Sequence, residues 1–186
     1  MEEMLNAIAD FKIAAIKEAA YQCHPDAIVY QDDWGSKQNV FLPPRTWREM
    51  IKPLQMKIAK AIKECGMLYI HHSDCYCEPL ASDMVDIGID AWQGVIPEND
   101  IVAIQEKTEH QLAMIGGIDG PALDKEDVTV EEVRSEVRRA VDSYCPGGKF
   151  FPGAPAMLLR EKNAKMLADE LTSYGAEWAS EHPIEL

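Results

Sequence analysis

The sequence predicts an α/β fold in which parallel strands alternate with helices. Two short apolar runs, at residues 27–31 and 67–71, end abruptly in polar residues, as buried strands do where they open onto one end of a parallel sheet or barrel. Stretches with helical spacing of apolar residues lie between such runs, and the connecting loops are short. Right-handed crossovers then leave an open doubly wound sheet or part of a (β/α)8 barrel. A complete barrel takes about 250 residues, and this chain has 186.

The first half of the chain is expected to contain two helix–strand units. Apolar residues at helical spacing predict a helix over residues 4–22, which leads into the strand at 27–31. Pro53 can begin the next helix, because proline is tolerated in a first helical turn, and Gly66 can end it. The chain then returns to the sheet through the strand at 67–71.

The second half continues the alternation with three more strands. Thr129 and Glu132 have the spacing of a capping box, in which each side chain bonds the other residue's backbone, so a helix is expected to begin there. Gly88 and Gly175 are expected to end helices. The expected strands cover residues 89–95, 111–115 and 147–151, and the expected helices cover residues 78–87, 97–107, 129–144 and 156–174.

Composition excludes several classes of partner. The formal net charge is −14 with no basic stripe, so a nucleic-acid surface or an anionic membrane surface is not expected. No run approaches the roughly 18 apolar residues of a spanning helix, and the acidic N-terminus differs from a signal peptide. We therefore expect a cytoplasmic protein with small-molecule or protein partners. The five cysteines are an odd number, which favours free thiols or metal ligands over a disulfide framework.

Candidate catalytic residues follow the first two strands. Asp32 and Asp33 are adjacent, so strand alternation should direct one inward and the other toward the loop, and His72 and Asp74 follow the next strand. A carboxylate here could bind substrate, orient the histidine or act as a general acid or base. The alternative for the two aspartates is a structural role in a turn.

Candidate substrate-binding residues lie at the ends of three strands. Trp34 follows the first strand, Trp92 and Gln93 end the third, and Asp119 follows the glycines at 116 and 117. An indole could form a platform for substrate or could pack in the core. The glycines could let backbone amides approach an anionic group, and a tight strand exit explains them equally well.

Six polar segments in a fixed order resemble the uroporphyrinogen decarboxylase superfamily. That superfamily includes uroporphyrinogen decarboxylases and the zinc methyltransferases that move methyl groups between corrinoid proteins and coenzyme M or tetrahydrofolate. Its members are (β/α)8 barrels, so the resemblance implies that residues 1–186 form a single partial domain. That domain would be the C-terminal part of a TIM-type barrel, with about five parallel βα units. The matching segments lie at residues 32–35, 43–53, 72–74, 88–90, 97–100 and 116–119.

The methyltransferase branch implies a zinc held by a His-x-Cys pair after one strand and by a cysteine after the last strand. Zinc on such ligands presents a substrate thiolate to the methyl donor. His72 matches the histidine, but Asp74 stands at the next ligand position, and residues 150–153 contain no cysteine. His72, Cys75 and Cys77 are therefore the candidate metal ligands, with Asp74 a further donor. The alternative is that the cysteines begin a helix and only His72 and Asp74 face the pocket.

Three functions remain open at this point. The first is a methyltransferase-like enzyme, or part of one, that transfers a methyl group between a corrinoid carried by a partner protein and a thiol or pterin. The second is a uroporphyrinogen decarboxylase-type lyase acting on a tetrapyrrole. The resemblance places the arginine-rich segment and the catalytic aspartate of decarboxylases in an N-terminal portion that has no counterpart here. The third is a non-catalytic subunit, and an incomplete barrel predicts a homo-oligomer or a complementing N-terminal chain that covers its strand edges.

Overall fold

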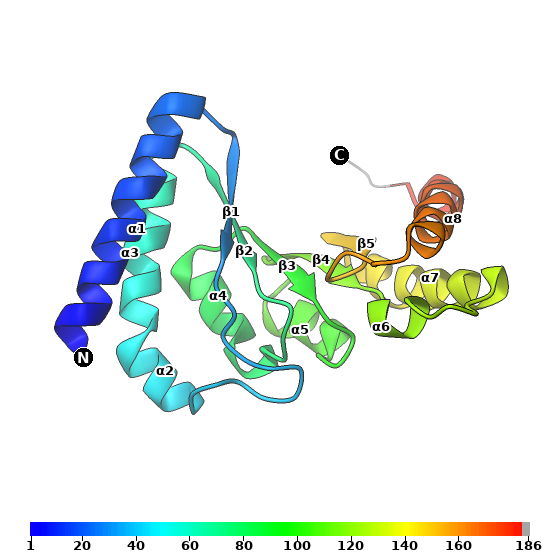
Figure 1. The fold of residues 1–186 in the computed structure, drawn as a ribbon, viewed down its shortest axis with the longest axis horizontal. Coiled ribbons are helices and arrows are strands. Elements are labelled where there is room, and N and C mark those ends of the chain that lie inside the picture. The colour runs from blue at the N-terminus through cyan, green and yellow to red at the C-terminus, as the bar shows by residue number, and fades with distance from the viewer. Residues whose placement is uncertain (184–186) are drawn as a thin grey trace.

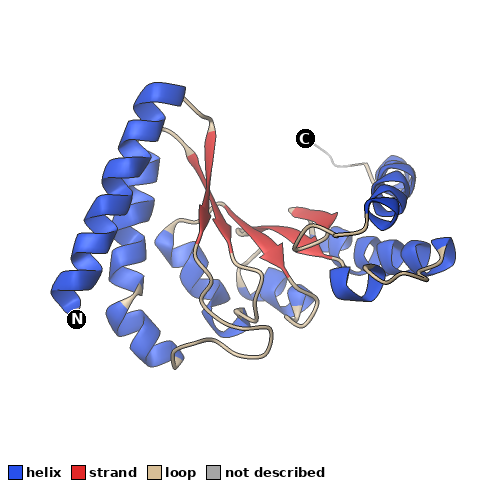
Figure 2. Ribbon diagram, viewed as in Figure 1, coloured by secondary structure: helices blue, strands red, loops and turns tan. Residues whose placement is uncertain are grey.

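The computed structural model describes residues 1–183 and contains one sheet of five parallel strands (Figures 1 and 2). The strands follow one another across the sheet in chain order, as expected when each strand is joined to its neighbour by a helix. The predicted α/β fold, as part of a (β/α)8 barrel, is confirmed. The strands are β1 (Ala27–Gln31), β2 (Leu68–His72), β3 (Ala91–Val95), β4 (Ala113–Gly117) and β5 (Phe150–Gly153).

Helices connect the strands and cover one face of the sheet (Figure 2). The predicted capping box is confirmed, because the Thr129 hydroxyl accepts from the Glu132 amide and the Glu132 carboxylate accepts from the Thr129 amide. No helix in the described part of the chain is long and apolar enough to cross a membrane. The helices are α1 (Glu2–Cys23), α2 (Pro44–Met50), α3 (Lys52–Glu64), α4 (Ala81–Ile87), α5 (Ile101–Lys107), α6 (Gly120–Leu123), α7 (Val130–Tyr144) and α8 (Glu161–Glu181), with 3-10 turns at Glu78–Leu80 and Cys145–Gly147.

The C-terminal helix differs from the prediction. We expected it to end at Gly175, but α8 continues through that glycine to Glu181. A glycine inside a helix costs only about 1 kcal/mol relative to alanine. Tyr174 and Trp178, on either side of Gly175, pack against the core, and this packing extends the helix beyond the glycine. The short helices α2 and α6 were not predicted.

The two faces of the sheet have different surroundings. The register aligns Tyr30 with His71 and His71 with Trp92, and all three side chains are buried beneath the helices. The residues that alternate with them along β1 and β2 point to the other face, where Val29 is 53% exposed and Leu68 is 54% exposed. In the ribbon, no described helix lies over this face of β1 and β2 (Figure 1). In a closed barrel these apolar side chains would form the packed interior.

Aromatic residues fill the space between β1, β2 and helices α2 and α3. Trp34 packs between the Trp47 indole and the His71 imidazole, with ring centroids 4.5 Å and 4.1 Å away. His71 is completely buried, and burial together with the neighbouring His72 lowers its pKa to about 3. His71 is therefore a neutral core residue.

The buried neutral state of His71 predicts a pH dependence of stability. In the unfolded chain His71 should bind a proton below its ordinary pKa of 6.5, whereas the folded chain resists protonation down to about pH 3. Its contribution is complete above pH 6.5 and is lost as the pH falls, by about 1.4 kcal/mol of unfolding free energy per pH unit. We expect the unfolding free energy, measured by urea unfolding at pH 7, 6, 5 and 4, to fall less steeply with pH in His71→Phe than in the wild type. The exposed His110 provides the control, because His110→Asn should keep the pH dependence of the wild type. The same pH dependence in all three proteins would contradict the prediction.

Candidate functional site

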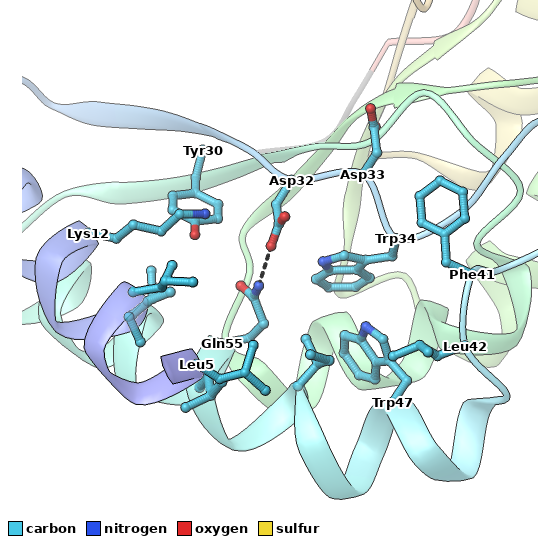
Figure 3. Close-up of a pocket in the computed structure, with 15 residues that line it drawn as sticks. Leu5, Lys12, Tyr30, Asp32, Asp33, Trp34, Phe41, Leu42, Trp47 and Gln55 are labelled. Atoms are coloured by element: carbon cyan, nitrogen blue, oxygen red, sulfur yellow. Dashed lines mark hydrogen bonds between the residues drawn. The ribbon is translucent and has the colours of Figure 1, made fainter. Parts of the chain in front are cut away.

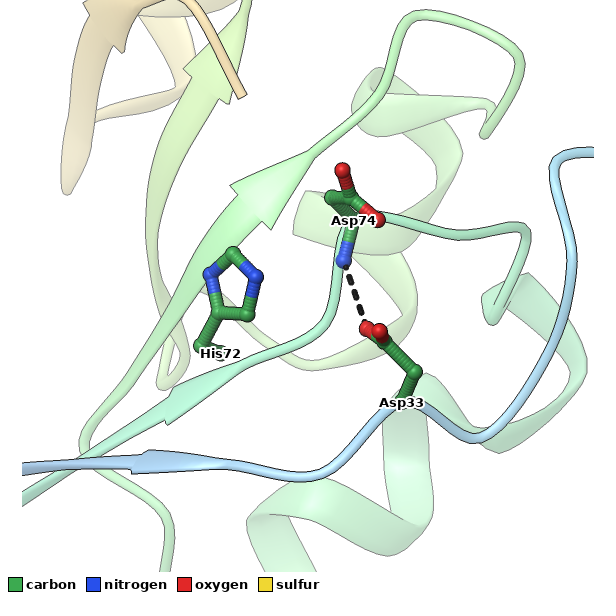
Figure 4. Close-up of side chains that lie close together, drawn as sticks. All are labelled: Asp33, His72 and Asp74. Atoms are coloured by element: carbon green, nitrogen blue, oxygen red, sulfur yellow. Dashed lines mark hydrogen bonds between the residues drawn. The ribbon is translucent and has the colours of Figure 1, made fainter. Parts of the chain in front are cut away.

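The adjacent carboxylates after β1 point to opposite sides of the chain. Asp32 turns toward the helices, where one carboxylate oxygen accepts a hydrogen bond of 2.6 Å from the Gln55 amide (Figure 3). Asp33 turns the other way, and its carboxylate accepts from the backbone amide of Asp74 at 3.2 Å (Figure 4). The two aspartates therefore belong to two different environments, as strand alternation predicts.

Asp33, His72 and Asp74 form a cluster at the carboxyl ends of β1 and β2. One ligand atom from each of the three side chains lies within 4.8 Å of the others. Figure 4 shows the imidazole with one nitrogen turned toward the two carboxylates. Asp33 is exposed and the other two are half-buried, so the cluster is open to a ligand from solvent.

A side chain from the next strand fixes the orientation of the histidine. Nδ1 of His72 is hydrogen bonded to the side-chain oxygen of Gln93, which lies directly opposite in the register of β2 and β3. The Gln93 amide in turn donates to the backbone oxygen of Pro155 at 3.4 Å. Because Nδ1 is engaged, Nε2 is the nitrogen left for a ligand.

This donor set is suited to a divalent cation. Zinc in catalytic sites is held by three protein ligands, drawn from His, Asp, Glu and Cys, with a further position open to water or substrate. Metal-binding histidines also use their second nitrogen in a hydrogen bond that sets the ring orientation, as Gln93 does for His72 here. The oxygen-rich set is harder than the cysteine-containing set expected from sequence, so it also suits manganese or ferrous iron.

Lys37 is the competing positive charge at this cluster. Its ammonium lies 3.0 Å from the Asp74 carboxylate, in the loop that follows β1, and its side chain is 54% exposed. Such an exposed pair is weak, but a cation bound by Asp74 would have to displace the ammonium or lie beside it.

We expect Lys37→Met to strengthen zinc binding about two- to fivefold, because the substitution removes the ion pair that competes for Asp74. Isothermal titration with zinc measures the change. Lys60→Met is the matched control, since Lys60 pairs with Glu64 on the surface of α3 and should leave the affinity unchanged. Weaker binding by Lys37→Met would show that Lys37 supports the cluster.

The structure places Cys75 and Cys77 in a separate buried group. Their sulfurs are 3.3 Å apart, and the Ser73 hydroxyl is 2.9 Å from the Cys75 sulfur. Hydrogen bonds from Cys77 and Ser73 lower the pKa of the Cys75 thiol to about 7, while the same pairing and burial raise the pKa of Cys77. Neither cysteine belongs to the cluster of Asp33, His72 and Asp74. Of the residues expected in this loop, His72 and Asp74 lie together with Asp33, apart from the two cysteines.

The four residues expected to contact substrate have different positions. Trp92 is completely buried and its indole donates to the Ser73 backbone oxygen at 2.8 Å, so it lies in the core and not in a pocket wall. Trp34 is 4% exposed and lines a cavity beneath the helices (Figure 3). Gln93 supports His72. Asp119 caps α6, and together with Asp74 it lines a hollow of ≈ 420 Å³.

Sequence reasoning missed three residues that organise this region. They are Lys37 beside Asp74, Gln55 beside Asp32, and Asn99, whose side-chain oxygen accepts from the amides of Cys77 and Glu78. Asn99 lies in the segment 97–100 that resembles the family, so the resemblance could have indicated it. Lys37 and Gln55 gave no signal, because their partners are distant in the chain.

Every arginine is already paired with a carboxylate. The closest pairs include Arg48 with Asp83 at 2.9 Å and Arg139 with Glu136 at 2.6 Å. Within residues 1–183, which contain all six arginines, each guanidinium therefore has a carboxylate partner. Arg45 pairs with Glu49, and Arg160 pairs with Asp124. Arg134 pairs with Glu131 and Glu170, and Arg138 also pairs with Glu170.

Comparisons with known proteins agree with this architecture. The family model described as Uroporphyrinogen decarboxylase (URO-D) matches residues 1–153. A search of curated proteins found no match. Among solved structures, the chain is similar to a methyltransferase from Methanosarcina mazei, with a TM-score of 0.71 and 19% sequence identity. The similarity covers 94% of this chain and 49% of that protein, so the chain spans about half the length of its structural neighbour.

Proposed function

Because the chain belongs to the uroporphyrinogen decarboxylase family, we propose that it is the C-terminal part of a methyltransferase-like barrel enzyme of that family. The reaction would transfer a methyl group between a corrinoid, carried by a partner protein, and a thiol or pterin acceptor. The observation that carries this proposal is the open cluster of Asp33, His72 and Asp74 at the carboxyl ends of the strands. Active sites of barrel enzymes lie at this end.

The three side chains have distinct roles in this proposal. Asp33, Asp74 and Nε2 of His72 would hold a zinc ion, and Gln93 would keep the imidazole in position. Bound zinc would lower the pKa of a substrate thiol, so that a thiolate is present at neutral pH. A corrinoid bound by a partner protein would supply the methyl group, so that a carbon–sulfur bond would replace the cobalt–carbon bond and the electron pair of that bond would stay with the corrinoid. The thiol proton leaves to solvent.

A hollow beside the cluster gives space for the acceptor. It has a volume of ≈ 420 Å³ and is lined by Lys37 and Asp74 on one side and by Pro155 and Leu158 on the other. This size suits a small acceptor. In a complete barrel, further strands would cover the exposed apolar face of β1 and β2 and exclude water from the cluster. We propose that these strands come from a complementing N-terminal part.

The decarboxylase reading is weaker for a chemical reason. An acidic tetrapyrrole needs cationic groups for its carboxylates, and the arginines of this chain are all occupied in ion pairs. The cluster itself is acidic, so it would repel such a substrate.

Two measurements test the proposal. Native mass spectrometry of the chain prepared without chelator reports the subunit number and bound metal together, and we expect about one zinc per chain. Zinc-loaded chain is then mixed with methylcobalamin and 2-mercaptoethanesulfonate, and the change in the visible spectrum of the corrinoid measures demethylation. Zinc-dependent demethylation that is lost in Asp33→Asn would support the proposal. Zinc binding without demethylation would contradict catalysis by this chain alone and would favour a non-catalytic partial-barrel subunit.

A further inference from the structure

A second cavity lies between β1 and the helices, next to the residues that follow β1. Its volume is ≈ 240 Å³, and it is bordered by α1, α2 and α3 and by the residues that follow β1, with exposed side chains such as Phe41 at its opening (Figure 3). The view shows Lys12 and Tyr30 at one end, the two indoles of Trp34 and Trp47 at the other, and Asp32 with Gln55 between them. The remaining wall is mostly aliphatic. Asp33 also borders this cavity, but its carboxylate belongs to the cluster, and His72 and Asp74 do not line the cavity.

Two hydrogen-bond donors at one end of the cavity have no partner. Trp34 is 4% exposed and Trp47 is 2% exposed, and within residues 1–183 neither indole Nε1 makes a hydrogen bond. Buried donors are almost always paired, because leaving one unpaired costs free energy of folding. Both indoles line the cavity and lie 4.5 Å apart, so one acceptor group in the cavity could meet both.

An acceptor stands opposite these donors. One oxygen of the Asp32 carboxylate accepts from Gln55, and no described residue bonds the other. The ammonium of Lys12 lies 4.7 Å from the centre of the Tyr30 ring in the same cavity and offsets the charge of Asp32. The cavity therefore has donors at one end, an acceptor in the middle, balanced charge and flat aromatic surfaces.

We propose that this cavity is a binding site for a neutral, flat cyclic amide of one or two rings. Its carbonyl oxygen would accept from the indoles of Trp34 and Trp47, and its ring N–H would donate to Asp32. A cavity of about 150 Å³ holds benzene, so the larger volume here admits one or two fused rings. A tetrapyrrole is too large. A carboxylate ligand has no N–H to donate to Asp32, whereas a neutral cyclic amide satisfies both the donors and the acceptor.

Indole NMR signals report the proposed contacts directly. The chain has four tryptophans, so a 15N-labelled sample gives four indole N–H signals, and the probe is quinolin-2(1H)-one. We expect saturable shifts of the Trp34 and Trp47 signals. Trp92, which bonds Ser73, and Trp178, which stacks on His182 in α8, should not respond. Shifts of all four signals, or of none, would overturn the proposal.

Ligand analogues test the polar contacts without changing the protein. N-methylquinolin-2-one lacks the ring N–H, and naphthalene lacks both polar groups. Isothermal titration should show binding at least about fivefold weaker for N-methylquinolin-2-one, and weaker still for naphthalene. Equal affinity for all three would reduce the site to an apolar cavity and overturn the proposal.

A pair of variants tests the protein side. Trp47→Phe keeps an aromatic surface and removes one donor, so affinity for quinolin-2(1H)-one should fall about fivefold. Trp178→Phe is the matched control and should bind normally, since Trp178 lies outside the cavity. Unchanged affinity in Trp47→Phe would contradict the assigned contact. These tests need no metal and no corrinoid, so their outcome is independent of the proposed methyl transfer.

Discussion

His72→Ala is expected to reduce the affinity for zinc at least about 100-fold. The substitution removes the only nitrogen donor from the cluster and leaves the carboxylates of Asp33 and Asp74. Loss of a residue that merely orients a metal ligand costs 10- to 100-fold, so loss of the ligand itself should cost at least the upper value. Isothermal titration of the metal-free chain with zinc measures the change. The fold should remain intact, because His72 is only half-buried and faces away from the helices.

Two controls separate this prediction from its alternatives. His182→Ala removes an exposed histidine at the end of α8 and should bind zinc normally. The double variant Cys75→Ser with Cys77→Ser should also keep zinc, because the structure buries both sulfurs away from the cluster. Loss of zinc in the double variant would restore the cysteine-containing ligand set that the family resemblance implies. Unchanged affinity in His72→Ala would remove the metal site.

Gly116→Ala is expected to lower the free energy of unfolding by about 2 to 6 kcal/mol. Gly116 has a φ of 145°, which side chains rarely adopt, and it pairs with Val95 at the irregularity between β3 and β4. A Cβ there would overlap the backbone oxygen of Val95 and lie 2.9 Å from its nitrogen. The neighbour is backbone in the middle of the sheet, so it cannot move aside. Urea unfolding measures the loss.

Two other glycines separate the cost of the unfavourable φ from the cost of steric overlap with a neighbouring strand. Gly148 has a φ of 72° with nothing within 4 Å of an added Cβ, so Gly148→Ala should cost only about 1 to 2 kcal/mol. Gly153 has open space and no left-handed φ, so Gly153→Ala should change stability by less than about 0.5 kcal/mol. If Gly116→Ala behaved like Gly148→Ala, close strand packing would not explain Gly116. The alternative role in approaching an anionic group would then regain weight.

The sheet could be predicted because its signals are local. Apolar runs that end in polar residues located β1 and β2, and the spacing of Thr129 and Glu132 located the start of α7. The end of α8 could not be predicted from Gly175, because packing of Tyr174 and Trp178 against the core outweighs the weak preference of one glycine. Helix α2 was missed because it is short and begins at consecutive prolines.

The candidate site was predicted in part for a similar reason. Their positions at the ends of two neighbouring strands placed Asp33, His72 and Asp74 at one end of the sheet, and the structure brings them together. The burial of Cys75 and Trp92 could not be predicted, because it depends on contacts of the loop after β2 with Trp34 and with β3, and no local sequence pattern encodes these contacts. The ion pair of Lys37 with Asp74 could not be predicted for the same reason, because the two residues are distant in the chain.

The adjacent aspartates after β1 link the two faces of the molecule. Asp32 borders the cavity beneath the helices and Asp33 belongs to the cluster on the open side, so one peptide unit separates two recognition sites. A ligand at either carboxylate therefore contacts a side chain of the same short backbone segment. Thermodynamic reciprocity then requires that any change in cation affinity caused by an occupant of the cavity be matched by an equal change in affinity for that occupant. Measuring one binding constant with the other site saturated would give the coupling free energy of this dipeptide.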